Sequence, residues 1–161
     1  METKTKSGKT GKAVEKPADG TMVPQGELWS SFYAVAQHWQ SDIKFFEAEL
    51  SFFRLLIDKN LSPLIEASNI EQTRKMVSHV TNLEKERGVL ASQISKHIEH
   101  IVALIENPFA QDAQQFKGEH AKLEKAFVDF MKSFRSVKSE VFKLNEQVVR
   151  SEKVKRLIDR T

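Results

Sequence analysis

An apolar repeat of seven residues, present in three long runs, is the feature that most constrains the fold of this chain. In each run, apolar residues recur at alternating spacings of three and four, as in helices that pack at a shallow crossing angle. Strands would require an alternation of period two, which we do not find. The first run is Phe32, Ala36, Trp39, Ile43, Phe46, Leu50, Phe53 and Ile57; the second is Met76, Val80, Leu83, Arg87, Leu90, Ile94, His97, Ile101 and Leu104; the third is Phe116, His120, Leu123, Phe127, Phe130, Phe134, Val137, Val141, Leu144 and Val148.

Prolines separate the three runs. Pro63 and Pro108 stand between them, and proline is tolerated in a helix only within the first turn. The pattern predicts helices over residues 28–59, 69–106 and 111–158. Residues 1–26 contain four of the six glycines and two of the four prolines, with few large apolar side chains. We expect this basic tail to be disordered and residues 27–161 to form the helical domain.

The connections predict the topology. A link of about four residues between the second and third helices forces an antiparallel hairpin, which places residue i of one level with residue 217 − i of the other. The looser turn near residue 64 similarly places residue i of the first helix level with residue 128 − i of the second. The expected fold is therefore all-α: an elongated, antiparallel three-helix bundle with coiled-coil-like packing, whose last helix projects beyond residue 149.

The charge distribution disfavours nucleic acid as a partner. The 25 basic and 22 acidic residues give a net charge of +3, and the first 16 residues alone account for it with five lysines and two glutamates. The predicted bundle is therefore neutral, without the basic excess that phosphate backbones require. The sequence contains no cysteine and no apolar stretch long enough to span a bilayer, and its first residues lack the apolar run typical of a secretory signal. We expect a cytoplasmic protein without membrane association.

Enzyme motifs fail on their spacing. Gly8, Lys9 and Thr10 imitate the end of a phosphate-binding loop, but Thr3 occupies the position that requires a glycine, and no strand precedes it. A carboxylate-bridged di-iron centre requires Glu three residues before a histidine, and none of the five histidines has one. We therefore expect no catalytic activity and no cofactor. Arg87 interrupts the second apolar run, and we expect Asp42 or Glu47 to pair with it.

Histidines occupy apolar positions at one level of the predicted bundle. The register places His97 opposite His120, and His100 lies one turn away from His97. Three interpretations remain open. The pair is a polar layer that fixes the register, a proton switch in which two imidazolium ions repel each other, or part of a metal site with His100.

Apolar residues outside the repeats suggest interaction surfaces. Phe45, Phe52 and Leu56 form a second stripe on the first helix, and Val154, Leu157 and Ile158 form one on the projecting end. The stripe on the first helix either completes the core or accepts another helix. No segment carries a family motif. We expect a helical interaction or scaffold protein that contacts a protein partner or a second copy of itself; the alternative is a metal-binding or pH-sensing bundle, and a third is association with a lipid or polymer surface.

Overall fold

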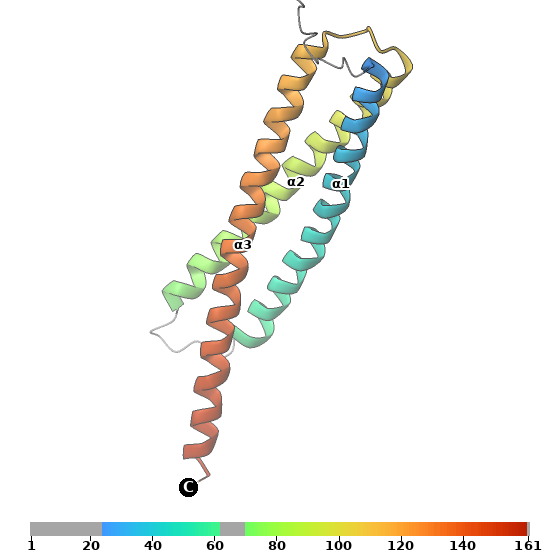
Figure 1. The fold of residues 1–161 in the computed structure, drawn as a ribbon. Helices are drawn as coiled ribbons and strands as arrows, with labels where there is room; N and C mark the ends of the chain where they lie inside the picture. The colour runs from blue at the N-terminus through green and yellow to red at the C-terminus, as the bar shows by residue number, and fades with distance from the viewer. Residues whose placement is uncertain (1–23, 62–69, 161) are drawn as a thin grey trace, which may run out of the picture.

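The protein is an elongated bundle of three helices (Figure 1). A computed structural model describes residues 24–61 and 70–160, and this part of the chain contains no strand. α1 (Gln25–Leu56) continues into the π-helical turn η1 (Ile57–Leu61), α2 (Ile70–Glu106) returns, and α3 (Ala113–Ile158) runs back alongside α1. The predicted helices are all present, and each begins and ends within three residues of its predicted bounds. The expected disorder of the N-terminal tail concerns residues 1–26, of which 1–23 lie outside the described residues.

The buried side chains are those of the three seven-residue repeats. Of the repeat residues named above, Phe32 and Arg87 are half-buried and the others are buried; Trp29 and Thr73 are buried in addition. Rings from α1 and α3 meet along most of this core. Phe46 contacts Phe130 at 5.3 Å and Phe134 at 4.7 Å between ring centroids, and Trp39 stacks on Phe127 at 5.8 Å. The period of the repeat therefore determines which faces are joined.

The turn between α2 and α3 is tied to the start of α1. Asp112 caps α3, because its side chain accepts a hydrogen bond from the backbone N–H of Gln114 at 2.7 Å. The fully buried Trp29 donates its indole N–H to the carbonyl oxygen of Pro108 at 3.3 Å. Its ring also meets Phe116 edge-on at 5.1 Å. All three helices are thus fastened together at this end of the bundle.

One of the two predicted registers is confirmed and the other is wrong. His97 and His120 are hydrogen-bonded to each other, as the pairing of α2 with α3 predicts. The predicted pairing of α1 with α2 would set Arg54 level with Arg74, whereas Arg54 binds Glu84, nearly three turns further along. The six-residue link before α3, residues 107–112, fixes the register of that hairpin, but the longer link after η1 does not. Side-chain pairing between α1 and α2 decides it instead.

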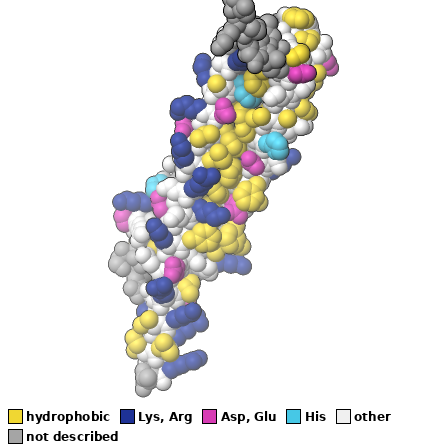
Figure 2. Space-filling view, in the orientation of Figure 1, with side chains coloured by type: hydrophobic (Ala, Val, Ile, Leu, Met, Phe, Trp, Pro, Cys, Tyr) yellow, Lys and Arg dark blue, Asp and Glu magenta, His cyan; other side chains and the backbone are white. Residues whose placement is uncertain are grey.

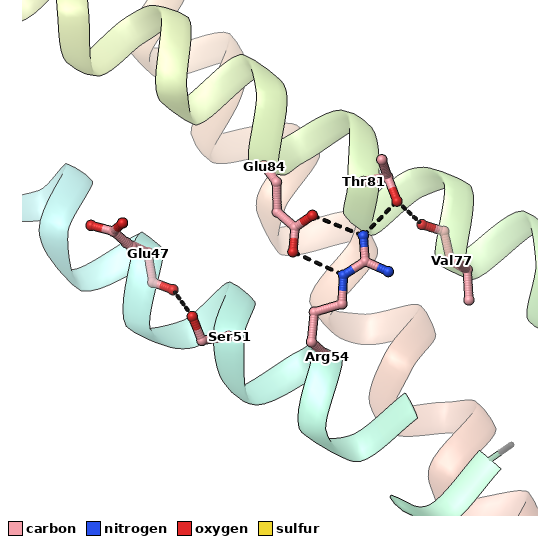
Figure 3. A network of polar contacts seen from close by, with 6 residues as sticks. All are labelled: Glu47, Ser51, Arg54, Val77, Thr81 and Glu84. Carbon is pink, nitrogen blue, oxygen red and sulfur yellow. Dashed lines mark hydrogen bonds and ion pairs between the residues drawn. The ribbon is translucent and has the colours of Figure 1, made fainter. Parts of the chain in front are cut away.

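Polar pairs flank the core where α1 meets each neighbour. Arg54 donates two hydrogen bonds to the Glu84 carboxylate, at 2.9 and 2.8 Å, and a third to the Thr81 hydroxyl (Figure 3). This arrangement raises the pKa of Arg54 and lowers that of Glu84, in both cases chiefly through the hydrogen bonds between them. On the opposite flank, Lys138 of α3 binds Glu49 at 2.7 Å. The two-point contact of Arg54 with Glu84 and the single contact of Lys138 with Glu49 fix the axial position of the helices.

Candidate functional site

The junction of α1 and α3 carries a long exposed apolar band, which we call the α1/α3 face. Figure 2 shows hydrophobic side chains running along this junction, with Lys and Arg side chains gathered on the α3 side. The salt bridge between Glu49 and Lys138 crosses the junction and locates its axis. The exposed or half-buried apolar residues on the two sides of this axis are Val35, Phe45, Phe52 and Leu56 from α1, and Val128, Phe142 and Val149 from α3.

The predicted stripe on α1 is mostly exposed. The side chains of Phe45 and Phe52 are 57% and 44% exposed, although they lie only one turn on either side of Glu49. Leu56 is half-buried and packs against the core. Phe45 touches Phe46 edge-on at 5.8 Å but leaves most of its ring in solvent. Phe45 and Phe52 therefore leave a large part of their rings exposed on the surface of the bundle.

The α3 side of the face was not anticipated. Phe142 is 43% exposed, with one edge against Phe53 at 6.2 Å and the Lys138 ammonium 5.9 Å from its ring centre. Val128 and Val149 are also exposed. Together with Arg135 these residues form a second seven-residue series, 128, 135, 142 and 149, adjacent to the core repeat. The sequence contains this spacing, but the more apolar core repeat of α3 directly adjoins it and dominated the interpretation.

The projecting end of α3 carries the other predicted surface. Val154, Leu157 and Ile158 are exposed, and the helix runs past the ends of α1 and α2 (Figure 1). It lies apart from Phe45 and Phe52 because it begins where the core repeat of α3 ends, after Val148. The six predicted interaction residues therefore belong to two separate surfaces.

The two predicted core histidines are in direct contact. His97 Nε2 and His120 Nδ1 lie 2.8 Å apart, and the two side chains are 8% and 7% exposed. One ring must be neutral at its accepting nitrogen for this hydrogen bond to form. The bond therefore requires that the two histidines are not both protonated.

Aromatic rings enclose the histidine pair. Phe32 and Trp39 of α1 stack on His120, with centroids 4.2 and 4.8 Å away. Phe116 stacks on His97 at 4.8 Å with the ring planes only 9° apart. α1 thus meets the pair with uncharged rings, and the sequence repeat had indicated the histidines but not this enclosure.

Burial shifts both imidazoles toward the neutral form. It is the main reason that the pKa of His97 falls from 6.5 to about 4, with further lowering from the nearby charges of His120 and His100 and a small opposing effect of Glu119. Burial also lowers the pKa of His120. A groove between α2 and α3 lies beside the pair and is lined by Lys96, His100, Glu119 and Lys122. His97 also lines this groove, so solvent reaches one edge of the histidine pair. The pair can take up protons only at a cost in stability.

The third predicted histidine stands apart from this hydrogen bond. His100 is half-buried and meets Phe116 edge-on at 5.1 Å. Within residues 24–61 and 70–160, no group of three or more His, Asp or Glu side chains is arranged to hold a metal ion. A metal at His97 and His120 would have to break their mutual hydrogen bond. The metal hypothesis stays a prediction without a ligand set in this part of the chain.

Arg87 pairs with Glu47, one of the two acids that the sequence predicts as its partner. Its guanidinium lies 3.3 Å from the Glu47 carboxylate, and the arginine side chain is largely buried. Glu47 also bonds through its backbone carbonyl to the Ser51 hydroxyl (Figure 3). Arg87 therefore helps to set the register of α1 and α2. Sequence reasoning missed the stronger pair between Arg54 and Glu84 because the predicted register of these helices was shifted.

Known proteins add no functional information. Comparison with protein-family models, curated proteins and solved structures finds no match to this chain. None of the helices in the described parts combines the length and the apolar composition needed to cross a bilayer. The geometry of the α1/α3 face and of the histidine pair is therefore the basis for a functional proposal.

Proposed function

We propose that this protein is a non-catalytic interaction protein that presents the α1/α3 face to another polypeptide. The observation that carries the proposal is the exposure of Phe45, Phe52 and Phe142 within one band along two helices. Contiguous apolar surface on a folded domain marks a contact site more often than isolated exposed residues do. The same reasoning, together with the absence of cysteine, favours a cytoplasmic scaffold or adaptor.

The aromatic composition suits a dry helix–helix contact. The chain has eleven phenylalanines and one tyrosine, so its exposed rings carry no hydroxyl that would favour a wet interface. Fully burying one phenylalanine is worth roughly 1.5–3 kcal/mol. Because Phe45, Phe52 and Phe142 are about half exposed, a partner that covers all three would gain roughly half of that from each ring. This binding free energy is comparable to the contribution of the few central residues of an interface, and smaller than that of a whole interface.

A binding role also agrees with the polar groups of the bundle. Every buried side-chain nitrogen or oxygen in the described parts has a hydrogen-bond partner. No such group is left orphaned there as a candidate acid or base. The polar pairs that flank α1 position helices, which is what a scaffold requires.

The test uses the full chain with Phe45→Ser and Phe52→Ser together. A tagged wild-type protein is expected to recover a second copy or a partner polypeptide, and the double variant to lose it. Val89→Ser is the matched control, because Val89 is 60% exposed on α2 and lines a different hollow between α2 and α3, beside Phe130. Circular dichroism must show equal helicity in all three proteins. Identical assembly and identical partner recovery in wild type and double variant would refute the proposal.

The contact between His97 and His120 favours a second candidate function, pH sensing. The pair is buried, mutually hydrogen-bonded and shifted toward the neutral form. Acidification would place two cations inside the aromatic enclosure and loosen the end of the bundle that holds Trp29 and Pro108. The corresponding experiment measures partner binding at pH 7.5 and pH 5.5. If the binding constant changes between these two pH values by the same factor in the wild type and in a variant without the two histidines, the pair does not sense pH.

A further inference from the structure

We infer that the occupant of the α1/α3 face is the same face of a second copy, in a dimer whose two bundles lie parallel. This inference rests on the proposed function and names its partner. The charges of the two helices that form the face carry it. They determine both which helix meets which and in which direction.

The two helices carry opposite charge. Up to Val148, where the core repeat ends, α3 holds seven Lys or Arg and five Asp or Glu, a net charge of +2, whereas α1 holds two basic and four acidic residues, a net charge of −2. Two acids of α1, Asp42 and Glu49, lie on the face, and Glu49 already pairs with Lys138 of its own chain. Both basic residues of α1 lie elsewhere: Arg54 binds Glu84 of α2, and Lys44 lines a pocket between α1 and α2. The α1/α3 face therefore carries an acidic residue, Asp42, on its α1 side and a basic residue, Arg135, on its α3 side, among the exposed apolar residues.

A two-fold axis along the length of the bundle brings the opposite charges of α1 and α3 together. A symmetric dimer uses the same patch on both copies. If the axis runs along the bundle, α1 of each copy lies against α3 of the other, and both copies point the same way. If the axis runs across the bundle, α3 lies against α3 and α1 against α1, so helices of like charge meet. Electrostatics therefore selects the parallel arrangement and disfavours the antiparallel one.

The levels of the residues agree with this arrangement. Within one chain, α1 and α3 run in the same direction, and Glu49 is level with Lys138, as Phe53 is with Phe142. A rotation about an axis parallel to the bundle does not change the position of a residue along it, so the same residues of α1 and α3 lie at the same height across the two copies. Phe52 of one copy then lies within one turn of Phe142 in the other, and Asp42 lies within about one turn of Arg135. Both the apolar and the charged residues find complementary neighbours.

The first measurement is the mass in solution at micromolar concentration, by light scattering or sedimentation. The wild type is expected to be a dimer, Phe45→Ser with Phe52→Ser a monomer, and Val89→Ser a dimer. A dimer that survives the double substitution uses another surface and overturns the inference. A monomeric wild type also overturns it. In that case the proposed function survives if the double variant still loses a different co-purifying protein, and fails if it loses nothing.

A charge exchange tests which helix meets which. One chain carries Asp42→Lys and the other Arg135→Glu, so each alone brings like charges together, both within its own chain and in a dimer with itself. Mixed one to one, the two chains regain opposite charges across the interface only. We expect at least a tenfold tighter mixed dimer than either self-dimer. Equal affinities for all three combinations would refute the pairing of α1 with α3.

Distance measurement tests the direction. The chain has no cysteine, so Gln114→Cys gives a single site for a spin label at the start of α3. In the parallel dimer the two labels lie at the same end, within about 30 Å of each other, whereas an antiparallel dimer would separate them by more than about 50 Å at 1.5 Å per residue. A distance in the longer range would contradict the parallel arrangement even if the protein is a dimer.

Discussion

Lowering the pH from 7.5 to 5 should destabilise the bundle by about 2 kcal/mol through His97 alone. The pKa of this residue is about 4 in the folded protein and 6.5 in an unperturbed imidazole. Because the folded pKa is lower, the unfolded chain binds a proton first as the pH falls. Stability is therefore complete above about pH 6.5 and declines between pH 6.5 and pH 4. The full effect of a shift of this size is about 3 kcal/mol at 1.36 kcal/mol per pKa unit.

The environment of the histidine explains the sign. His120 shares the hydrogen bond and has a lowered pKa as well, so its titration acts in the same direction. The groups that line the adjoining groove are Lys96 and His100 from α2 and Glu119 and Lys122 from α3, and of these only Glu119 is found to raise the pKa of His97. α1 meets the pair with the rings of Phe32 and Trp39.

The assay is thermal unfolding followed by circular dichroism at the two pH values. For a chain of this size, 2 kcal/mol corresponds to a decrease in Tm of about 6 °C. The reference is a variant with His97→Leu and His120→Phe, which keeps an apolar residue and a stacked ring at the two positions. Contributions of all other titrating groups are common to both proteins, so the difference between their pH responses isolates the pair. If the variant loses as much Tm on acidification as the wild type, the reasoning is refuted.

Three further predictions concern the packing, the polar pairs and a helical glycine. Phe116→Ala should cost about 3–5 kcal/mol of unfolding free energy because it leaves a cavity under Trp29 and His97, whereas Phe109→Ala, at an 82% exposed ring, should change it little; urea denaturation measures both. A double-mutant cycle of Arg54→Ala and Glu84→Ala should give a coupling energy of about 1 kcal/mol that shrinks in 1 M salt, and a coupling of zero would contradict the two-point contact. Gly88→Ala should raise stability by about 0.5–1 kcal/mol, because a methyl group at this helical position meets nothing within 4 Å; a lower Tm would oppose that view.

Periodicity was sufficient to predict the helices and most of the core. The same pattern, with the short link before α3, placed His97 opposite His120 without any structural information. The pairing of α1 with α2 could not be predicted in this way. A long connection leaves the axial position of two helices open, and specific contacts such as Arg54 with Glu84 then decide it.

The candidate site was only half visible in the sequence. Phe45 and Phe52 stood out because they lie off the core repeat of an apolar helix. Phe142 did not, because it directly follows the core residue Val141 and reads as part of the same hydrophobic segment. Whether such a ring is covered depends on the crossing of α1 and α3, which is a three-dimensional property. The aromatic enclosure of His120 escaped prediction for the same reason.

The extra length of α3 has a consequence for how the molecule responds to its surroundings. Beyond Val148 the helix continues for about three turns outside the hydrophobic core. Ion pairs between residues one turn apart, such as Arg150 with Glu146, stabilise a helix only slightly. A segment of this kind opens and closes at small energetic cost while the rest of the bundle stays intact. Its backbone amides should therefore exchange with solvent sooner than those of the buried part of α3.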